Sequence, residues 1–203
     1  VPRAAGAGGG VRDTMAAAVG AAMVTEGAQS QAETQARPSA SAPVTAYVGL
    51  GSNLDDPQVQ VRRALDALET LPATRLVSAS PLYATAPVGP QDQPDYVNAV
   101  ARLATGLTPS DFLAALLGIE ASQGRHRDGT RWGPRTLDLD LLLHGQARLA
   151  LAGLHLPHPQ IRHRAFVLIP LADVAPPDLE IPGQGILADL LRDCPADGVR
   201  PIT

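Results

Sequence analysis

The chain has 203 residues and a formal charge of −4, and all 16 of its basic side chains are Arg, with no Lys at any position. The absence of Lys excludes P-loop NTPases, whose Lys contacts the β- and γ-phosphates, and enzymes that form a Schiff base through a Lys amine. The acidic balance argues against a broad nucleic-acid-binding surface, and the single cysteine, Cys194, excludes an intrachain disulfide and a Cys-based zinc site.

Residues 1–43 are predicted to form a disordered N-terminal extension. They contain no Leu, no Ile and no aromatic residue, so they cannot bury enough apolar surface to offset the conformational entropy lost on folding. The apolar run 15–24 within them is too short to span a bilayer. We therefore expect one domain over residues 44–203 in a cytoplasmic protein that has no membrane partner.

The first predicted elements are a strand and a helix. Val44 to Leu50 alternates small and apolar residues, which indicates a strand. Asp56 followed by Pro57 is typical of a helix N-cap and first turn, and apolar residues then recur at helical spacing until Pro72.

Two further strands are predicted at 75–85 and 96–105, joined by a connection that holds three prolines and a glycine. Thr108-Pro109-Ser110-Asp111 then resembles a capping box, and the helix that it opens is predicted to end at Gly124. After an Arg- and Gly-rich loop, 137–143 reads as another strand.

This β-α-β-β-α-β order predicts an α+β protein with a ferredoxin-like core. Residues beyond 144 are less regular and are expected to add C-terminal elements, including a short helix near 186–192. Fold alone does not assign a function.

The predicted strand 137–143 carries two carboxylates, Asp138 and Asp140. Successive side chains on a strand alternate, so both aspartates share one face while Leu137, Leu139 and Leu141 share the other. Carboxylates roughly 7 Å apart can ligate a pair of hard cations, and Mg²⁺ usually binds one or two carboxylates plus substrate phosphates. The alternative is a half-exposed strand with a solvated acidic face, which is the commoner reason for this pattern.

The loop before that strand strengthens the first interpretation. It contains Arg125, Arg127, Arg131 and Arg135 but only one acid, Asp128. Guanidinium groups bind phosphate oxygens bidentately, and a glycine-containing loop can close over ATP as a lid. A solvated charged loop would not account for a Trp in its middle.

A second polar cluster lies at the start of the predicted strand 96–105. Tyr96 and Asn98 stand at i and i+2, hence on one face, and an aromatic plane beside an amide suits a flat heterocycle. From the residues alone, an ordinary hairpin connection with Tyr96 packed in the core is the better reading.

The run from Arg131 to Leu142, RWGPRTLDLDLL, resembles the signature of 6-hydroxymethyl-7,8-dihydropterin pyrophosphokinases. Twelve consecutive residues that include Trp and Pro make this resemblance specific. It extends in family order across essentially all of 44–203. Its further motifs are Gly51-Ser52-Asn53, Thr85-x-Pro87-x-Gly89, Gln93-Pro94-x-Tyr96-x-Asn98, Glu120, Gly124-Arg125, Pro157-His158 and Arg164-x-Phe166.

The resemblance implies transfer of pyrophosphate from ATP to the pterin hydroxymethyl group, with release of AMP, as a step of folate biosynthesis. It implies a monomer that acts on small molecules with two Mg²⁺ ions, which Asp138 and Asp140 would bind. The catalytic residues would be these aspartates with Arg125 and Arg135. The pterin would be bound by Gly51, Thr85, Val88, Tyr96, Asn98, Trp132 and Phe166, and ATP by Glu120, Arg125, Arg127, Arg135, Leu141, His158 and Arg164.

Several alternatives remain open at this point. Glu120 could be a helix-surface carboxylate and Phe166 a core residue. Gly153, His155 and Pro159 depart from the residues common in the family on the nucleotide side. His126, His144, His155 and His163 are read as surface or packing residues.

Two other protein classes share the predicted topology. A nucleotidyltransferase with two metal-binding carboxylates would release pyrophosphate rather than AMP. An RNA-binding sheet would need displayed aromatics and a basic face, for which six aromatic residues and a charge of −4 leave little room. A fusion to another folate enzyme is also open.

Overall fold

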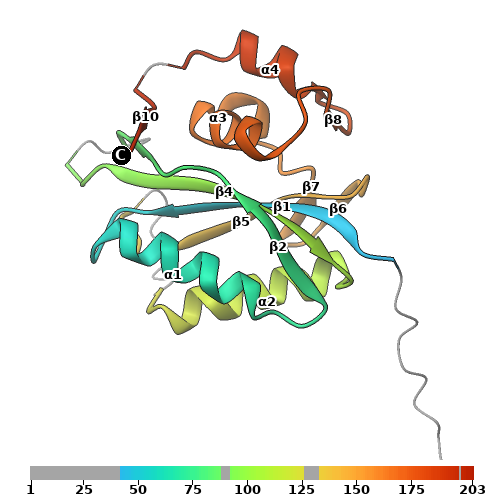
Figure 1. Cartoon of the computed structure of the whole chain (residues 1–203), viewed down its shortest axis with the longest axis horizontal. Helices are drawn as coiled ribbons and strands as arrows, with labels where there is room; N and C mark the ends of the chain where they lie inside the picture. The colour runs from blue at the N-terminus through green and yellow to red at the C-terminus, as the bar shows by residue number, and fades with distance from the viewer. Residues whose placement is uncertain (1–41, 88–91, 126–132, 197) are drawn as a thin grey trace, which may run out of the picture. The chain divides into compact units, whose positions relative to one another are not determined.

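The computed structural model describes residues 42–87, 92–125, 133–196 and 198–203 (Figure 1). The predicted extension 1–43 therefore lies almost wholly outside the described residues. The fold below is that of the unit formed by residues 40–203.

An antiparallel sheet forms the centre of this unit. Its strands follow the order β10-β3-β4-β1-β5, and β2 pairs with β4 beside β3. Every pairing in the sheet is antiparallel. The strands are β1 (Val44–Ser52), β2 (Thr74–Ala79), β3 (Tyr83–Thr85), β4 (Tyr96–Thr105), β5 (Asp138–His144) and β10 (Arg200–Pro201).

Helices cover both faces of the sheet (Figure 1). On one face, α1 (Pro57–Glu69) packs on β1, β2 and β4, and α2 (Pro109–Ser122) packs on β5 and α1. On the other face, α3 (Ala165–Val174) packs on β4, and α4 (Leu187–Asp193) packs on α3. The sheet therefore separates two apolar cores.

Strand β1 shows how the sequence supplies both cores. Ala46, Val48 and Leu50 point into the core under α1 and α2, whereas Tyr47 points into the core under α3. A fully buried side chain of the size of Val48 or Leu50 stabilises the fold by about 1.5–3 kcal/mol. Gly49 and Gly51 continue the α3 face without side chains, and a Cβ on Gly51 would lie 3.3 Å from Asn98 Oδ1. The end of β1 therefore leaves space on the α3 face.

The predicted caps of both main helices are present. Asp56 accepts a hydrogen bond from the Val59 amide at the start of α1, and Thr108 Oγ1 accepts one from the Asp111 amide at 3.2 Å at the start of α2. Gly124 follows α2 with a φ of +80°, a conformation that glycine adopts at helix ends without steric cost. Helix α1 ends at Glu69, three residues before the predicted limit at Pro72.

The predicted strand 75–85 is interrupted. It forms β2 and β3, separated by Ser80 to Leu82, because Pro81 has no amide hydrogen to donate to the sheet. Ser80 keeps this break close to β4. Its amide donates to Val100 O at 2.9 Å, and its hydroxyl accepts from Val100 N at 3.0 Å.

The C-terminal region contains more structure than the sequence predicts. The short helix expected at 186–192 is α4, but α3 was not expected. Hairpins β6–β7 (Leu149–Leu151, Leu154–Leu156) and β8–β9 (Glu180–Ile181, Gly185–Ile186) and a 3₁₀ turn (Ile161–His163) complete it. Within the described residues, no helix combines the length and apolar character needed to cross a bilayer.

Candidate active site

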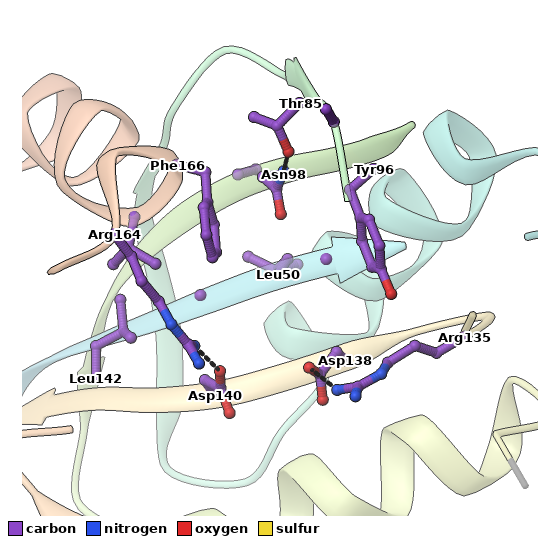
Figure 2. A pocket seen from close by; sticks show the side chains of 15 residues that line it. Leu50, Thr85, Tyr96, Asn98, Arg135, Asp138, Asp140, Leu142, Arg164 and Phe166 are labelled. Atoms are coloured by element: carbon purple, nitrogen blue, oxygen red, sulfur yellow. Dashed lines mark hydrogen bonds and ion pairs between the residues drawn. The ribbon is translucent and has the colours of Figure 1, made fainter. Parts of the chain in front are cut away.

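Two adjoining cavities flank the Asp138–Asp140 end of β5. One opens where β1, β4 and β5 meet the start of α3 (Figure 2), and the other opens between β5 and α2. The first, here called the aromatic cavity, is lined by Gly51, Thr85, Tyr96, Asn98 and Phe166 among others. The second, here called the arginine cavity, is lined by Leu113, Leu117, Glu120, Arg125, Ala152, Gly153 and His158 among others. Four charged residues line both cavities and so stand at their junction: Arg135, Asp138, Asp140 and Arg164.

The two aspartates occupy the positions that strand alternation predicts. Asp138 and Asp140 lie opposite Gly51 and Gly49 of β1 and line both cavities, while Leu139 and Leu141 are buried in the core under α1 and α2. The missing side chains of the glycines leave room for a ligand above the carboxylates. Residues 49 and 51 thus shape the site from the neighbouring strand.

Asp138 is neutralised by two arginines. Arg125 Nη1 donates to Asp138 Oδ1 at 2.5 Å, and Arg135 Nη1 donates to Asp138 Oδ2 at 2.6 Å. Although burial opposes the charge on Arg135, the Asp138 carboxylate holds the pKa of this guanidinium above its ordinary value. The charges of this half of the site are therefore balanced within the protein.

Asp140 is less well compensated. Among the described residues its ion-pair partner is Arg164, with Nη1 3.7 Å from Asp140 Oδ2. Burial, with the charge of Asp138 beside it, raises the pKa of Asp140 from 3.8 to about 6, and Arg164, Arg125 and Arg135 only partly oppose this rise. The native fold thus holds a carboxylate that is costly to ionise in the absence of a further cation.

The substitution Asp140→Asn should therefore stabilise the ligand-free, metal-free protein at pH 8. The native pKa exceeds the unfolded one, so the stability that Asp140 contributes is present below pH 3.8 and is lost as the pH rises through about 6. We expect the free energy of unfolding to rise by about 1 kcal/mol at pH 8. This is less than the pKa shift alone implies, because solvent screens a side chain that is 38% exposed. Urea unfolding in EDTA at pH 8 and pH 5 measures it, and an equal effect at both values would contradict the assignment.

Glu120 is a buried residue of α2, 2% exposed, and the reading of it as a helix-surface carboxylate is wrong. Its carboxylate oxygen Oε1 accepts two hydrogen bonds. One comes from Arg125 Nη1, and the other, at 2.8 Å, comes from the Leu139 amide of β5. Glu120 thus joins α2 to β5 between the two aspartates and holds Arg125 toward Asp138.

We expect Glu120→Ala to lower the free energy of unfolding by about 3 kcal/mol, because it leaves the Arg125 charge and the Leu139 amide without this partner. The control Glu69→Ala, at an exposed position on α1, should change it by less than about 0.5 kcal/mol. Urea unfolding followed by circular dichroism compares the two. Equal urea midpoints for the two variants would show that the buried Glu120 carboxylate does not stabilise the fold in this way.

The aromatic cavity has the form of a slot. Phe166 at the start of α3 and Tyr96 at the start of β4 stand on its two sides, with Asn98 and Thr85 between them (Figure 2). Asn98 Nδ2 donates to Thr85 Oγ1 at 2.8 Å, which leaves its Oδ1 directed into the slot. Tyr96 is half-buried and donates through its hydroxyl to Gly133 O at 3.2 Å, so it lines the cavity instead of filling the core.

Phe166 has two roles. It packs against the core under α3, as the alternative reading held, and it also lines the aromatic cavity. The Arg164 guanidinium lies 5.6 Å from the centre of its ring. One face of the slot is thereby joined to the cation that faces Asp140.

His158 enters the arginine cavity as a neutral side chain. Burial, reinforced by the charge of Arg164, lowers its pKa to about 4. Its Nδ1 accepts a hydrogen bond from the Gln160 amide at 3.2 Å, so the proton of the neutral ring is on Nε2. His158 can therefore donate one hydrogen bond at neutral pH without adding charge.

The other described histidines lie at the surface or pack in the interior, as predicted. His144 is a packing residue as expected, bonded to Leu107 O at 3.0 Å and in edge contact with Phe112. His155 and His163 are exposed, also as expected, and His126 lies outside the described residues.

Not all predicted site residues are brought together. Val88, Arg127 and Trp132 lie outside the described residues. Leu141 lines neither cavity, because strand alternation places its side chain in the core under α1 and α2, where it is 4% exposed. The prediction of an ATP contact through this side chain is therefore not supported by its position.

Sequence reasoning missed several lining residues. Gly49 precedes Gly51 by two positions, so the alternation of β1 could have identified it. Leu113 and Leu117 of α2 line the arginine cavity together with Glu120, and their spacing of i, i+4 and i+7 marks one helix face.

The donor set for a metal ion is small. Among the described residues, no group of three or more His, Cys, Asp or Glu side chains is arranged to hold an ion. A cation bound between Asp138 and Asp140 would therefore need further ligands from a substrate. This is the usual situation of Mg²⁺, which binds through one or two carboxylates plus substrate phosphates.

Comparisons with known proteins agree on one family. The model of the 7,8-dihydro-6-hydroxymethylpterin-pyrophosphokinase family matches residues 47–176. A protein of Pseudomonas aeruginosa named 2-amino-4-hydroxy-6-hydroxymethyldihydropteridine pyrophosphokinase is 57% identical over 153 residues, which cover 75% of this chain and 93% of that one. A Haemophilus influenzae protein of the same name is 47% identical over a match that covers 73% of this chain and 92% of that one.

Solved structures show the same fold. A Plasmodium falciparum HPPK-DHPS structure matches with a TM-score of 0.58 at 13% identity and covers 74% of this chain. This chain spans only 43% of that longer one.

Proposed function

The chain belongs to the 7,8-dihydro-6-hydroxymethylpterin-pyrophosphokinase family, and we propose that its two adjoining cavities hold the two substrates of that reaction. The enzyme transfers pyrophosphate from ATP to 6-hydroxymethyl-7,8-dihydropterin in folate biosynthesis, and the balance of phosphates leaves AMP as the second product. The observation that carries the proposal is the set of four charged residues that line both cavities. Residues that stabilise a group while it passes from one substrate to the other must contact both substrates.

The aromatic cavity is proposed to bind the pterin. Tyr96 and Phe166 would stack on its two faces, which is favourable for a flat heterocycle. Asn98 and Thr85 would bond its polar edge, and Gly51 admits the ring because it has no side chain. By the resemblance of their motifs, Val88 and Trp132 are assigned to the same substrate.

The arginine cavity is proposed to bind ATP. Leu113, Leu117 and Ala152 offer apolar surface to the base. His158, Arg164, Arg125 and Arg135 offer donors to the phosphates, and charge-assisted bonds from arginine are the stronger kind. Glu120 acts by holding Arg125. Arg127 and Leu141 retain their assignment to ATP from the resemblance alone.

Asp138 and Asp140 are proposed to hold two Mg²⁺ ions together with the phosphates. Their oxygen ligands suit a hard cation, and burial with the charge of Asp138 raises the pKa of Asp140, a cost that a bound cation would offset. When bound, the ions would neutralise phosphate charge and help to align the transferred group.

Asp138 forms ion pairs with Arg125 and Arg135. If ATP bound here, phosphate oxygens could replace Asp138 as the partner of the two arginines, and a cation could replace the arginines as the partner of Asp138, so no buried charge would be left unpaired. This exchange lowers the cost of opening a buried salt bridge.

The transfer itself requires little from side chains beyond alignment. The pterin hydroxyl oxygen attacks the β-phosphorus, the bond from that phosphorus to the α–β bridging oxygen breaks, and the hydroxyl proton is released. Arg125 and Arg135 stabilise the charge that spreads over the transferred group, and orientation supplies much of the rate.

The products test this reaction. Purified protein with ATP, Mg²⁺ and 6-hydroxymethyl-7,8-dihydropterin should form AMP and the pterin diphosphate in equal amounts, measured by chromatography. ADP as the stoichiometric product would indicate transfer of a single phosphoryl group. Free pyrophosphate would indicate the nucleotidyltransferase alternative.

We further propose that the core is ferredoxin-like, which the order β3-β4-β1-β5 with antiparallel pairing supports. The protein is proposed to be a cytoplasmic monomer. Residues 1–43 are proposed to be a disordered extension that the site does not need.

A further inference from the structure

Asn53 stands just beyond the end of β1 and is 1% exposed. It takes part in four hydrogen bonds to two separate segments. Its Nδ2 donates to Gln93 Oε1 at 3.1 Å and to Pro94 O at 3.2 Å. On the other side, its Oδ1 accepts from the Arg135 amide at 2.8 Å, and its own amide donates to Arg135 O at 3.1 Å.

These two segments carry opposite sides of the site. Pro94 lies two residues before Tyr96, which forms one side of the aromatic cavity. Arg135 lines both cavities and binds Asp138. Beyond Ser52, β1 no longer pairs with β4 and β5. At this point the Asn53 side chain connects the segment before β4, at Pro94, to the segment before β5, at Arg135.

The chemistry of an amide is required for this link. The Arg135 amide can only donate and the Pro94 carbonyl can only accept, so these backbone groups fix which end of the Asn53 amide faces which segment. Asp offers two acceptors and Ala offers neither group. Asn alone among residues of this size supplies a donor and an acceptor in one plane.

We propose that Asn53 is a positioning residue that sets the spacing between the pterin-binding wall at Tyr96 and the phosphate-binding Arg135. The inference rests on the proposed assignment of the two cavities. A hydroxyl and a phosphorus react rapidly only when they are held in near-attack geometry, and a displacement of about 1 Å costs on the order of 100-fold in rate. Asn53 touches neither substrate and acts through the two segments that it joins.

The first test is kinetic. Asn53→Ala should lower kcat about 100-fold, while the KM of each substrate rises less than about threefold, because each cavity keeps its own lining. The matched control is Thr108→Ala, which removes the N-cap of α2 and so lowers stability by an unrelated route. Its kcat should stay within twofold of wild type.

The second test separates the two sides of Asn53. Asn53→Asp keeps the acceptor for the Arg135 amide but places an oxygen against Gln93 Oε1 and Pro94 O. Hydrogen exchange of the Arg135 amide should accelerate at least tenfold in Asn53→Ala and stay near the wild-type rate in Asn53→Asp. Both variants should lose turnover.

Two results would overturn the proposal: a kcat for Asn53→Ala within threefold of the Thr108→Ala control, or Arg135 exchange that is unchanged in Asn53→Ala. Failure of the cavity assignment has a different signature. Wild-type protein itself would then not bind a non-hydrolysable ATP analogue with Mg²⁺, whereas the Asn53 variants are expected to retain that binding.

Discussion

Asp140→Ala should reduce the rate of pterin diphosphate formation by at least about 1,000-fold, since among the described residues it removes one of the two carboxylates that line both cavities. Asp138 alone would leave the proposed pair of ions with a single carboxylate from the protein. The fold should remain intact, because this side chain is 38% exposed and its loss relieves a costly charge. Steady-state turnover and circular dichroism on the same preparation measure both parts.

Asp66→Ala, at an exposed position of α1 away from both cavities, is the matched control and should keep wild-type turnover. If Asp140→Ala retained a rate near that of the control, the carboxylate would have no part in cation binding. If it lost its circular dichroism spectrum, Asp140→Asn offers the same test with less change of volume.

Arg135→Ala should lower kcat by about 100- to 1,000-fold, with a smaller rise in the KM for ATP. Arg135 is the one cation among the described residues that lines both cavities and also binds Asp138, so its effect should be greatest where charge is transferred. Arg135→Lys should recover only part of the rate, because an ammonium group cannot bind two phosphate oxygens in a planar, bidentate way.

The exposed Arg62 of α1 provides the control for loss of a positive charge, and Arg62→Ala should leave kcat unchanged. A full rescue by Lys at position 135 would show that a point charge suffices there. An effect on KM alone would place Arg135 in ground-state binding and not in stabilisation of the transferred group.

The parts of the structure that follow from local rules could be predicted from the sequence. The caps at Asp56 and Thr108 lie where the capping pattern places them, because a side-chain acceptor before an amphipathic run satisfies a free amide. Asp138 and Asp140 lie on the same face of β5 because side chains alternate along a strand. The break at Pro81 could have been predicted by the same kind of rule.

The parts that depend on tertiary packing could not be predicted in this way. Helix α3 is apolar on most of its surface and contains Pro170, so it shows neither a helical period nor an uninterrupted run. The resemblance assigned Phe166 and Tyr96 to one substrate, but only the packing of α3 on β4 brings them to opposite sides of a slot. The bonds of Glu120 and Asn53 likewise arise from segments far apart in the chain, for which a single sequence carries no signal.

Asp138 and Asp140 are proposed to hold two divalent ions together between the substrates. Counting bound Mn²⁺ per chain by electron paramagnetic resonance, with a saturating non-hydrolysable ATP analogue, tests this assignment. Wild-type protein should bind two ions, and Asp140→Ala should bind fewer at the same analogue occupancy. A single ion in the wild type, or two ions in Asp140→Ala, would contradict the claim.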